Sequence, residues 1–289
     1  MGWRVHLGLG RVSNLPTVWS NVLAGAVLSG GRLEAGALGA LLIALSLFYI
    51  GGMYLNDAFD RKIDARERPE RPIPSGKISA VKVFGIGYGM LAVAIVILVV
   101  TAGWWSDRPG WPAVASGGAL GAVIVYYDAR HKRDPLSPLW MGLCRVLIYT
   151  TVGLAVAGHV STPLIGGALI LLSYLIGLTY VAKQETLTEY RNLWPLLFLF
   201  APFVYSVSVF SSAGGALIYA GFLGWVCYAI SWLIRKGRVN IPRAVISFIA
   251  GISLLDALLI AGAGHPGLAL WGIAGFVLTL FLQRYVRGT

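Results

Sequence analysis

Long apolar segments separated by short polar loops cover almost the whole chain. Ten of them approach the roughly 20 residues that a helix needs to cross a bilayer. Their hydrophobicity is continuous and does not alternate, which favours helices over a barrel. We therefore predict an all-α fold, a polytopic transmembrane helical bundle of nine to ten spans forming one domain over residues 1–289. The predicted spans are 13–30, 35–58, 79–104, 112–128, 138–158, 162–182, 192–211, 214–234, 242–262 and 266–285.

Composition agrees with a lipid environment. Hydrophobic residues make up 57% of the chain and charged residues 12%. A soluble domain needs more polar surface than this. The net charge of +11 would suggest nucleic acid in a soluble protein, but here the basic residues stand in short loops between apolar segments. The sequence therefore predicts a lipid bilayer as a partner and no nucleic acid.

The distribution of Lys and Arg predicts the orientation in the membrane. If the N-terminus is cytoplasmic and ten spans follow, 20 basic residues fall on the cytoplasmic side. Only Arg32 and Arg108 fall outside, and Arg145 stays within a span. The positive-inside rule then places both termini in the cytoplasm.

Acidic residues gather at the cytoplasmic end of the second span, where Asn56, Asp57, Asp60 and Asp64 form the pattern N-D-x-x-D-x-x-x-D. Steps of three and four residues keep side chains on one face of a helix. Mg²⁺ prefers oxygen ligands and is typically held by one or two carboxylates together with substrate phosphates. The pattern therefore predicts a Mg²⁺ site at the cytoplasmic face.

A second acidic pair, Glu185 and Glu189, follows the sixth predicted span with helical spacing. Two carboxylate clusters at one membrane face are suited to two Mg²⁺ ions around one diphosphate. The alternative is that these acids are solvated loop charges balanced by nearby arginines. Two features favour a site: the first acids begin inside the helix end, and a rigid basic turn from Arg71 to Lys77 follows them.

These motifs resemble a known family. The N-D-x-x-D-x-x-x-D pattern followed by R-P-x-P-S-G-K is similar to the first aspartate-rich motif of the UbiA superfamily of membrane prenyltransferases. Residues 11–25 resemble the family's first helix, and Tyr126, Tyr127 and Lys132–Arg133 resemble its basic loop after the fourth helix. Residues 126–145 look most similar to the bacterial branch named EboC.

Three departures from the family pattern stand out. Glu185-x-x-x-Glu189 occupies the place of a D-x-x-x-D motif. Ten spans are predicted where the family typically has nine. Asp128 and Asp134 are not general family features.

The resemblance implies an enzyme that moves an isoprenyl group from an allylic prenyl diphosphate to a small aromatic or polar acceptor, with Mg²⁺ as cofactor. It also implies a bacterial inner membrane and an active site facing the cytoplasm. The implied catalytic and metal-binding residues are Asp57, Asp60, Asp64, Glu185 and Glu189. The implied substrate-binding residues are Asn56, Arg71, Lys77, Lys132, Arg145, Arg11, Tyr127 and Lys183.

Several residues have two interpretations. Arg11 opens the first span, where it is suited either to a substrate or to anchoring at the interface. Arg145 lies inside a span, and intramembrane charges usually face the bundle interior, which favours a cavity position. For Asp256 either pairing or solvation at the outer interface is favoured over catalysis, and His131 is expected at the surface.

Two other classes of function compete with the enzyme. A secondary transporter typically carries ionisable residues near the midplane at broken helices, whereas these acids gather at one face. A lipid-binding membrane protein without catalysis would tolerate the replacement of Asp by Glu in the second motif.

Overall fold

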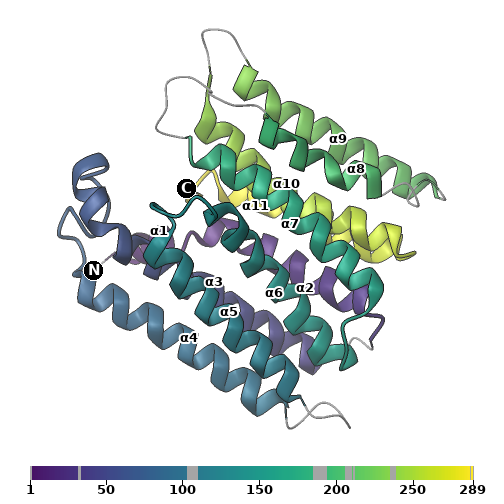
Figure 1. The fold of residues 1–289 in the computed structure, drawn as a ribbon, viewed down its shortest axis with the longest axis horizontal. Coiled ribbons are helices and arrows are strands. Elements are labelled where there is room, and N and C mark those ends of the chain that lie inside the picture. The colour runs from purple at the N-terminus through teal and green to yellow at the C-terminus, as the bar shows by residue number, and fades with distance from the viewer. Residues whose placement is uncertain are drawn as a thin grey trace.

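The computed structural model describes residues 2–31, 34–102, 110–184, 194–205, 210, 212–234, 239–286 and 288. This part of the chain is helical and contains no strand, so the all-α prediction is confirmed. Figure 1 shows the helices stacked side by side, with both chain ends at the same end of the bundle. The elements are α1 (Trp3–Leu9), η1 (Val12–Asn14), α2 (Leu15–Ser29), α3 (Ala35–Glu67), α4 (Ala80–Ala102), α5 (Trp111–Arg130), α6 (Ser137–Ala157), α7 (Thr162–Ala182), η2 (Trp194–Phe200), α8 (Ala201–Tyr205), α9 (Ala213–Ile234), α10 (Ile241–Gly262) and α11 (Pro266–Leu282).

Six of the described helices, α3, α4, α6, α7, α9 and α10, are long and apolar enough to cross a membrane. Two apolar helical segments, Trp194–Val204 and Pro266–Leu282, are shorter. The chain is thus an integral membrane protein, and the total of nine or ten spans stays a prediction.

The elements differ from the predicted spans in three places. A separate helix, α1, precedes the first predicted span. The helix α3 continues to Glu67, beyond the predicted end at residue 58, and stops just before Pro69, because the residue before a proline disfavours helical backbone. The predicted span 192–211 is, in its described part, a 3₁₀ helix followed by the short α8. Pro195 and Pro202 lack the N–H that a continuous α-helix uses, which hydropathy alone does not register.

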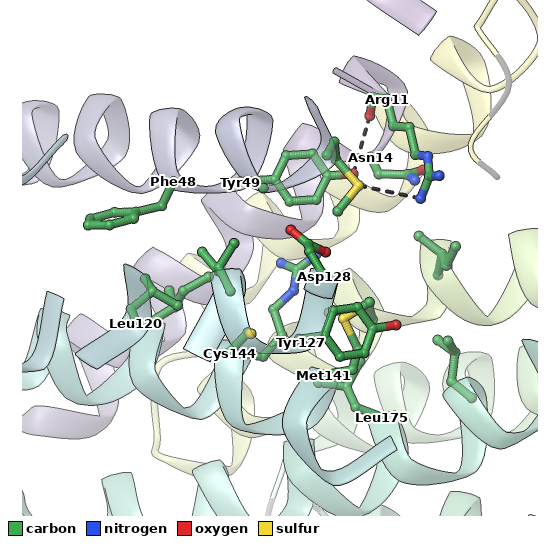
Figure 2. A pocket seen from close by; sticks show the side chains of 18 of the residues that line it. Arg11, Asn14, Phe48, Tyr49, Leu120, Tyr127, Asp128, Met141, Cys144 and Leu175 are labelled. Atoms are coloured by element: carbon green, nitrogen blue, oxygen red, sulfur yellow. Dashed lines mark hydrogen bonds between the residues drawn. The ribbon is translucent and has the colours of Figure 1, made fainter. Parts of the chain in front are cut away.

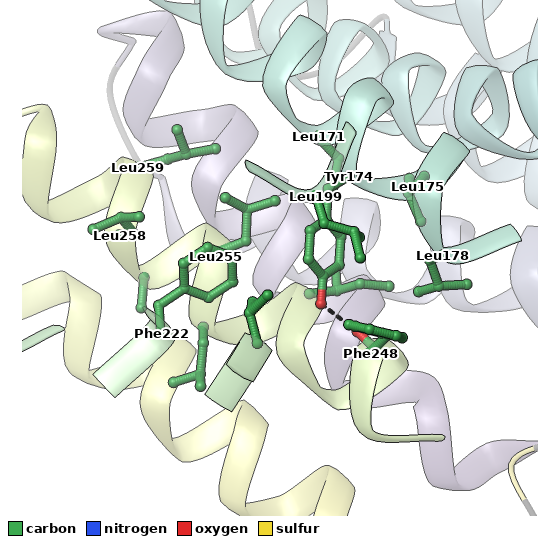
Figure 3. Close-up of a cluster of buried hydrophobic side chains, with 14 of the residues drawn as sticks. Leu171, Tyr174, Leu175, Leu178, Leu199, Phe222, Phe248, Leu255, Leu258 and Leu259 are labelled. Carbon is green, nitrogen blue, oxygen red and sulfur yellow. Dashed lines mark hydrogen bonds between the residues drawn. The ribbon is translucent and has the colours of Figure 1, made fainter. Parts of the chain in front are cut away.

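Two apolar cores hold the bundle together. One forms between α2, α3, α4, α5 and α6 and includes Phe48, Leu120 and Ile148. The other forms around α10, which is buried along most of its length and packs against α2, α7, α9 and α11. In the second core the Tyr174 hydroxyl donates a hydrogen bond to the Phe248 carbonyl at 2.9 Å (Figure 3).

The close contact between α3 and α4 depends on glycine. A Cβ atom at Gly51 would lie 2.9 Å from the carbonyl oxygen of Gly87 and 3.1 Å from the Cβ of Met90. This contact fixes the helix that carries the predicted carboxylate motif.

We expect Gly51→Ala to lower the free energy of unfolding by about 1–3 kcal/mol, because backbone atoms must move to admit the methyl group. Thermal unfolding in detergent, followed by circular dichroism, measures the loss. Gly39→Ala is the matched control on the same helix, where a Cβ would meet nothing within 4 Å. Equal midpoints for the two variants would contradict this explanation of the packing.

Candidate active site

Three carboxylates share one face of α3. Asp57, Asp60 and Asp64 are 8%, 6% and 4% exposed, so the helix carries them into the protein instead of into solvent. Arg71 joins two of them, since its Nη1 lies 3.2 Å from Asp57 Oδ1 and 3.0 Å from Asp64 Oδ2. The rigid basic turn predicted after α3 therefore folds back onto the carboxylate stripe.

The Asp60 carboxylate lies beside the C-terminal end of α5. Its Oδ2 lies 3.4 Å from His131 Nε2 and 3.7 Å from Lys132 Nζ. The His131 ring also stacks on Tyr127, with ring centroids 4.9 Å apart. The prediction that His131 is a surface residue was therefore wrong, because it did not anticipate that α5 ends against α3.

Arg11 reaches the same stripe from the segment before α2. Its Nη2 lies 3.3 Å from both Asn56 Oδ1 and Asp57 Oδ1. Burial alone would lower the pKa of Arg11, but Asp57 and other nearby acidic groups outweigh it and raise the pKa, so Arg11 stays charged. Its backbone is left-handed, with φ 41°, a conformation that costs a non-glycine residue about 1–2 kcal/mol. The surrounding contacts hold the side chain over α3 despite this cost.

A cavity of about 130 Å³ opens beside the carboxylate stripe (Figure 2). It lies between the two apolar cores, because Phe48, Leu120 and Ile148 of one core and Leu175 and Leu178 of the other line it. The polar residues on its walls are few: Arg11, Asn14, Tyr49, Tyr127, Asp128 and Arg145. The cavity wall is therefore mostly apolar, and Arg11, which pairs with Asp57, connects it to the stripe.

Arg145 lies on the cavity wall, as its position inside a span predicted. Its guanidinium donates to Asn21 Oδ1 at 2.7 Å and to Thr17 Oγ1 at 3.1 Å, and it lies over the Tyr49 ring. Among the described residues no carboxylate is within ion-pair distance of it. Tyr49 precedes Asp57 on α3 by two helical turns, or roughly 12 Å, so Arg145 lies deeper in the membrane than the stripe.

A buried polar network connects Arg145 through Asn21 to Asp256. Asp256 is 0% exposed and accepts two hydrogen bonds from Asn21 Nδ2, at 3.0 and 2.8 Å. Tyr149 and Ser20 donate to the same carboxylate. Of the two alternatives predicted for Asp256, the structure shows the paired one and not solvation at the outer interface.

Some predicted site residues lie apart from the stripe. Lys77 is exposed and contacts none of the three carboxylates. Lys183 Nζ donates to the Asp134 carbonyl at 3.0 Å and to Ser137 Oγ at 2.8 Å, which ties the end of α7 to the start of α6. Partial burial lowers the pKa of Lys183, although Asp134 acts in the opposite direction. Glu185 and Glu189 lie outside the described residues.

Asp128 is the residue that the sequence interpretation left without a role. It lines the cavity from α5 and is 3% exposed. Its Oδ1 accepts a hydrogen bond from Asn56 Nδ2 at 3.1 Å, whereas its Oδ2 has no partner among the described residues. The signal was present in the sequence, since Asp128 continues the buried stripe of α5 formed by Ala113, Gly117, Leu120 and Ile124 at steps of three and four.

Solved structures share this architecture. A digeranylgeranylglyceryl phosphate synthase superposes with a TM-score of 0.58 at 17% identity, over 91% of this chain and 97% of that one. A UbiA homologue from Archaeoglobus fulgidus, bound to DMAPP and Mg²⁺, gives a TM-score of 0.51 at 13% identity, over 93% and 99% of the two chains. At these identities the likeness concerns the fold.

Sequence comparison finds curated relatives. The digeranylgeranylglyceryl phosphate synthase of Methanopyrus kandleri is 33% identical over 141 residues, 46% of each chain. The protein of the same name from Ignicoccus hospitalis is 31% identical over 180 residues, 61% of this chain and 56% of the relative. The matches thus span about half the length of these relatives.

The fold and the site together define a polytopic membrane protein with a charged stripe beside a mostly apolar cavity. The UbiA prenyltransferase family model matches residues 15–288, nearly the whole chain. The chain belongs to the UbiA prenyltransferase family.

Proposed function

We propose that this protein transfers an isoprenyl group from an allylic prenyl diphosphate to a small polar acceptor, with Mg²⁺ assisting departure of the diphosphate. The observation that carries the proposal is the junction of two environments. Buried carboxylates and basic groups lie beside a cavity whose wall is mostly apolar, and Arg11 both lines this cavity and pairs with Asp57. A prenyl diphosphate has the same division, with a charged head and an apolar tail.

Mg²⁺ fits the donor set of the stripe. No group of three or more His, Cys, Asp or Glu side chains in the described part of the chain is arranged to hold a metal ion by itself. Mg²⁺ is commonly held by one or two carboxylates plus substrate phosphates, so a complete protein cage is not required. Asp57 and Asp64 already face one cation, Arg71, and they and Asp60 would supply oxygens to the metal. The A. fulgidus homologue was solved with DMAPP and Mg²⁺.

The basic residues around the stripe are suited to the diphosphate. Arg11, Arg71 and Lys132 reach the carboxylates from three different elements. When the C–O bond of the donor breaks, its electron pair leaves on the diphosphate, and charges already in place stabilise it. Bound Mg²⁺ would supply further positive charge to the same oxygens. Lys77 and the pair Glu185 and Glu189 remain predicted members of this site.

The apolar cavity wall would hold the isoprenyl tail and exclude water from the allylic cation. Tyr127 lines this wall beside the stripe, where an aromatic ring stabilises nearby positive charge. Arg145, deeper on the wall, would hold an anionic group of the acceptor. The names of the curated relatives point to glyceryl phosphate compounds as one such class. The cytoplasmic orientation and the bacterial origin remain predictions.

The direct test is prenyl transfer by the purified protein in nanodiscs. Geranyl diphosphate and Mg²⁺ are supplied with either a 1-O-alkylglyceryl phosphate or 4-hydroxybenzoate. We expect one of the acceptors to gain the mass of one geranyl group, with an equal amount of diphosphate released, and both signals to disappear with EDTA. If neither acceptor is prenylated and no diphosphate is released, the proposal fails for this donor class. Binding of geranyl diphosphate without turnover would instead indicate a lipid-binding protein without catalysis.

A further inference from the structure

Asp128 lines the cavity, and one of its buried carboxyl oxygens, Oδ2, has no hydrogen-bond partner among the described residues. Burying a polar group without a hydrogen-bond partner costs free energy, so nearly all such groups in folded proteins are paired with protein, water or ligand. Asp128 Oδ2 has no hydrogen-bond partner among the described residues, although the residue is only 3% exposed. Figure 2 shows this carboxylate among the side chains that line the cavity.

The position of Asp128 relates it to the predicted reaction centre. Its other oxygen, Oδ1, accepts a hydrogen bond from the side-chain amide of Asn56. The amide oxygen of the same Asn56 side chain accepts a hydrogen bond from Arg11. Arg11 in turn pairs with Asp57 of the stripe. One amide and one guanidinium therefore connect Asp128 to the stripe, and Arg11 and Asp128 both line the cavity. A group hydrogen-bonded to Oδ2 would therefore lie close to the proposed diphosphate site.

An unpaired carboxyl oxygen in an apolar environment is satisfied by accepting a hydrogen bond. It therefore selects a protic, uncharged group such as an alcohol, a phenol or an amine. The anionic part of an acceptor is better served by Arg145, whose guanidinium lies on the same cavity wall. A water molecule would satisfy Oδ2 in the absence of such a ligand.

We propose that Asp128 Oδ2 binds the nucleophilic end of the acceptor by accepting a hydrogen bond from its hydroxyl or amine group. This deepens the proposed function and rests on it. It specifies the acceptor as a hydrogen-bond donor at the atom that attacks the prenyl group. It also assigns Asp128 to acceptor binding and not to the metal or the diphosphate.

Asp128→Asn is the sharp variant for this proposal. Its Oδ1 can still accept from Asn56, whereas Oδ2 becomes an amide that donates. The test compares hydroxyl compounds with their O-methyl ethers, which cannot donate. The probes are 1-O-octadecylglyceryl phosphate and 4-hydroxybenzoate, each with its methyl ether. Binding to the purified protein is measured by calorimetry in the presence of Mg²⁺ and geranyl S-thiolodiphosphate, an analogue that resists ionisation.

We expect the wild-type protein to bind at least one hydroxyl compound more tightly than its ether, by roughly 5–100-fold, because the ether leaves a buried oxygen without a hydrogen-bond partner. Asp128→Asn should lose this preference. Asp134→Asn is the control and should keep the preference for the hydroxyl compound. Asp134 lies outside the cavity lining, where its carboxylate accepts hydrogen bonds from Leu136 N and Trp140 Nε1. This comparison isolates the one hydrogen bond, as a double-mutant cycle does.

Two results would overturn the assignment: a wild-type protein that prefers neither hydroxyl compound over its ether, or an Asp128→Asn variant that retains the preference. Mg²⁺-dependent binding of the geranyl analogue is measured in parallel for every variant. If the wild-type protein does not bind the analogue, the proposed function fails. If it does, only the role of Asp128 is at stake.

Discussion

Asp57→Ala is expected to reduce Mg²⁺-dependent release of diphosphate from geranyl diphosphate by roughly 10³-fold, the scale found when a group that stabilises developing charge is removed. Asp57 is the carboxylate that both Arg11 and Arg71 contact, at 3.3 and 3.2 Å. Its loss removes a proposed ligand for Mg²⁺ and leaves two guanidinium groups without this ion-pair partner. Diphosphate release under single-turnover conditions measures the effect.

Glu67→Gln is the matched control for Asp57→Ala. Glu67 is an acidic residue of the same helix, but it is exposed and lies outside the buried stripe. It should keep wild-type turnover. Wild-type turnover by Asp57→Ala and Asp60→Ala alike would show that the stripe is not the metal site.

Asp256→Ala is expected to lower the free energy of unfolding by about 3 kcal/mol. The carboxylate is fully buried, and its removal leaves the Tyr149 hydroxyl and the Asn21 amide without their partner. Each buried group left unsatisfied costs about 1–3 kcal/mol. For a chain of this size the midpoint of thermal unfolding should fall by about 5–10 °C.

Two comparisons make the stability effect specific. Asp256→Asn keeps an oxygen that accepts from Tyr149, so it should lose less stability than Asp256→Ala. Glu34→Ala, at an exposed carboxylate that makes no capping hydrogen bond at the start of α3, should leave the midpoint unchanged. A midpoint for Asp256→Ala equal to that of the wild-type protein would mean that the network around Arg145 does not stabilise the bundle.

The sequence predicted the carboxylate stripe well because the information is local. Spacings of three and four residues place Asp57, Asp60 and Asp64 on one face of any helix. The length of α3 was not predicted. Hydropathy identifies the apolar residues of a span, but it does not register that the helix continues through buried, paired charged residues. The break at residues 194–205 was missed for the related reason that an apolar segment counts as continuous even where prolines interrupt its hydrogen bonds.

The partners of the stripe depend on tertiary contacts that no spacing records. Arg11 reaches Asp57 across 46 positions in the chain, and His131 reaches Asp60 because α5 ends beside α3. Asp128 stands two positions before the basic run Arg130, His131 and Lys132, so the sequence interpretation did not assign this carboxylate to the buried face of α5. Helical periodicity carried to the last turn of each span would identify such residues.

The most direct test of the account is the binding of geranyl S-thiolodiphosphate to the purified protein with and without Mg²⁺. The account predicts tight binding that requires Mg²⁺, that Asp57→Ala abolishes and that Glu67→Gln preserves. The contradicting result would be binding that is as strong without Mg²⁺ as with it, or as strong in Asp57→Ala as in the wild-type protein. Either would contradict the claim that the α3 stripe holds a Mg²⁺–diphosphate complex beside the cavity.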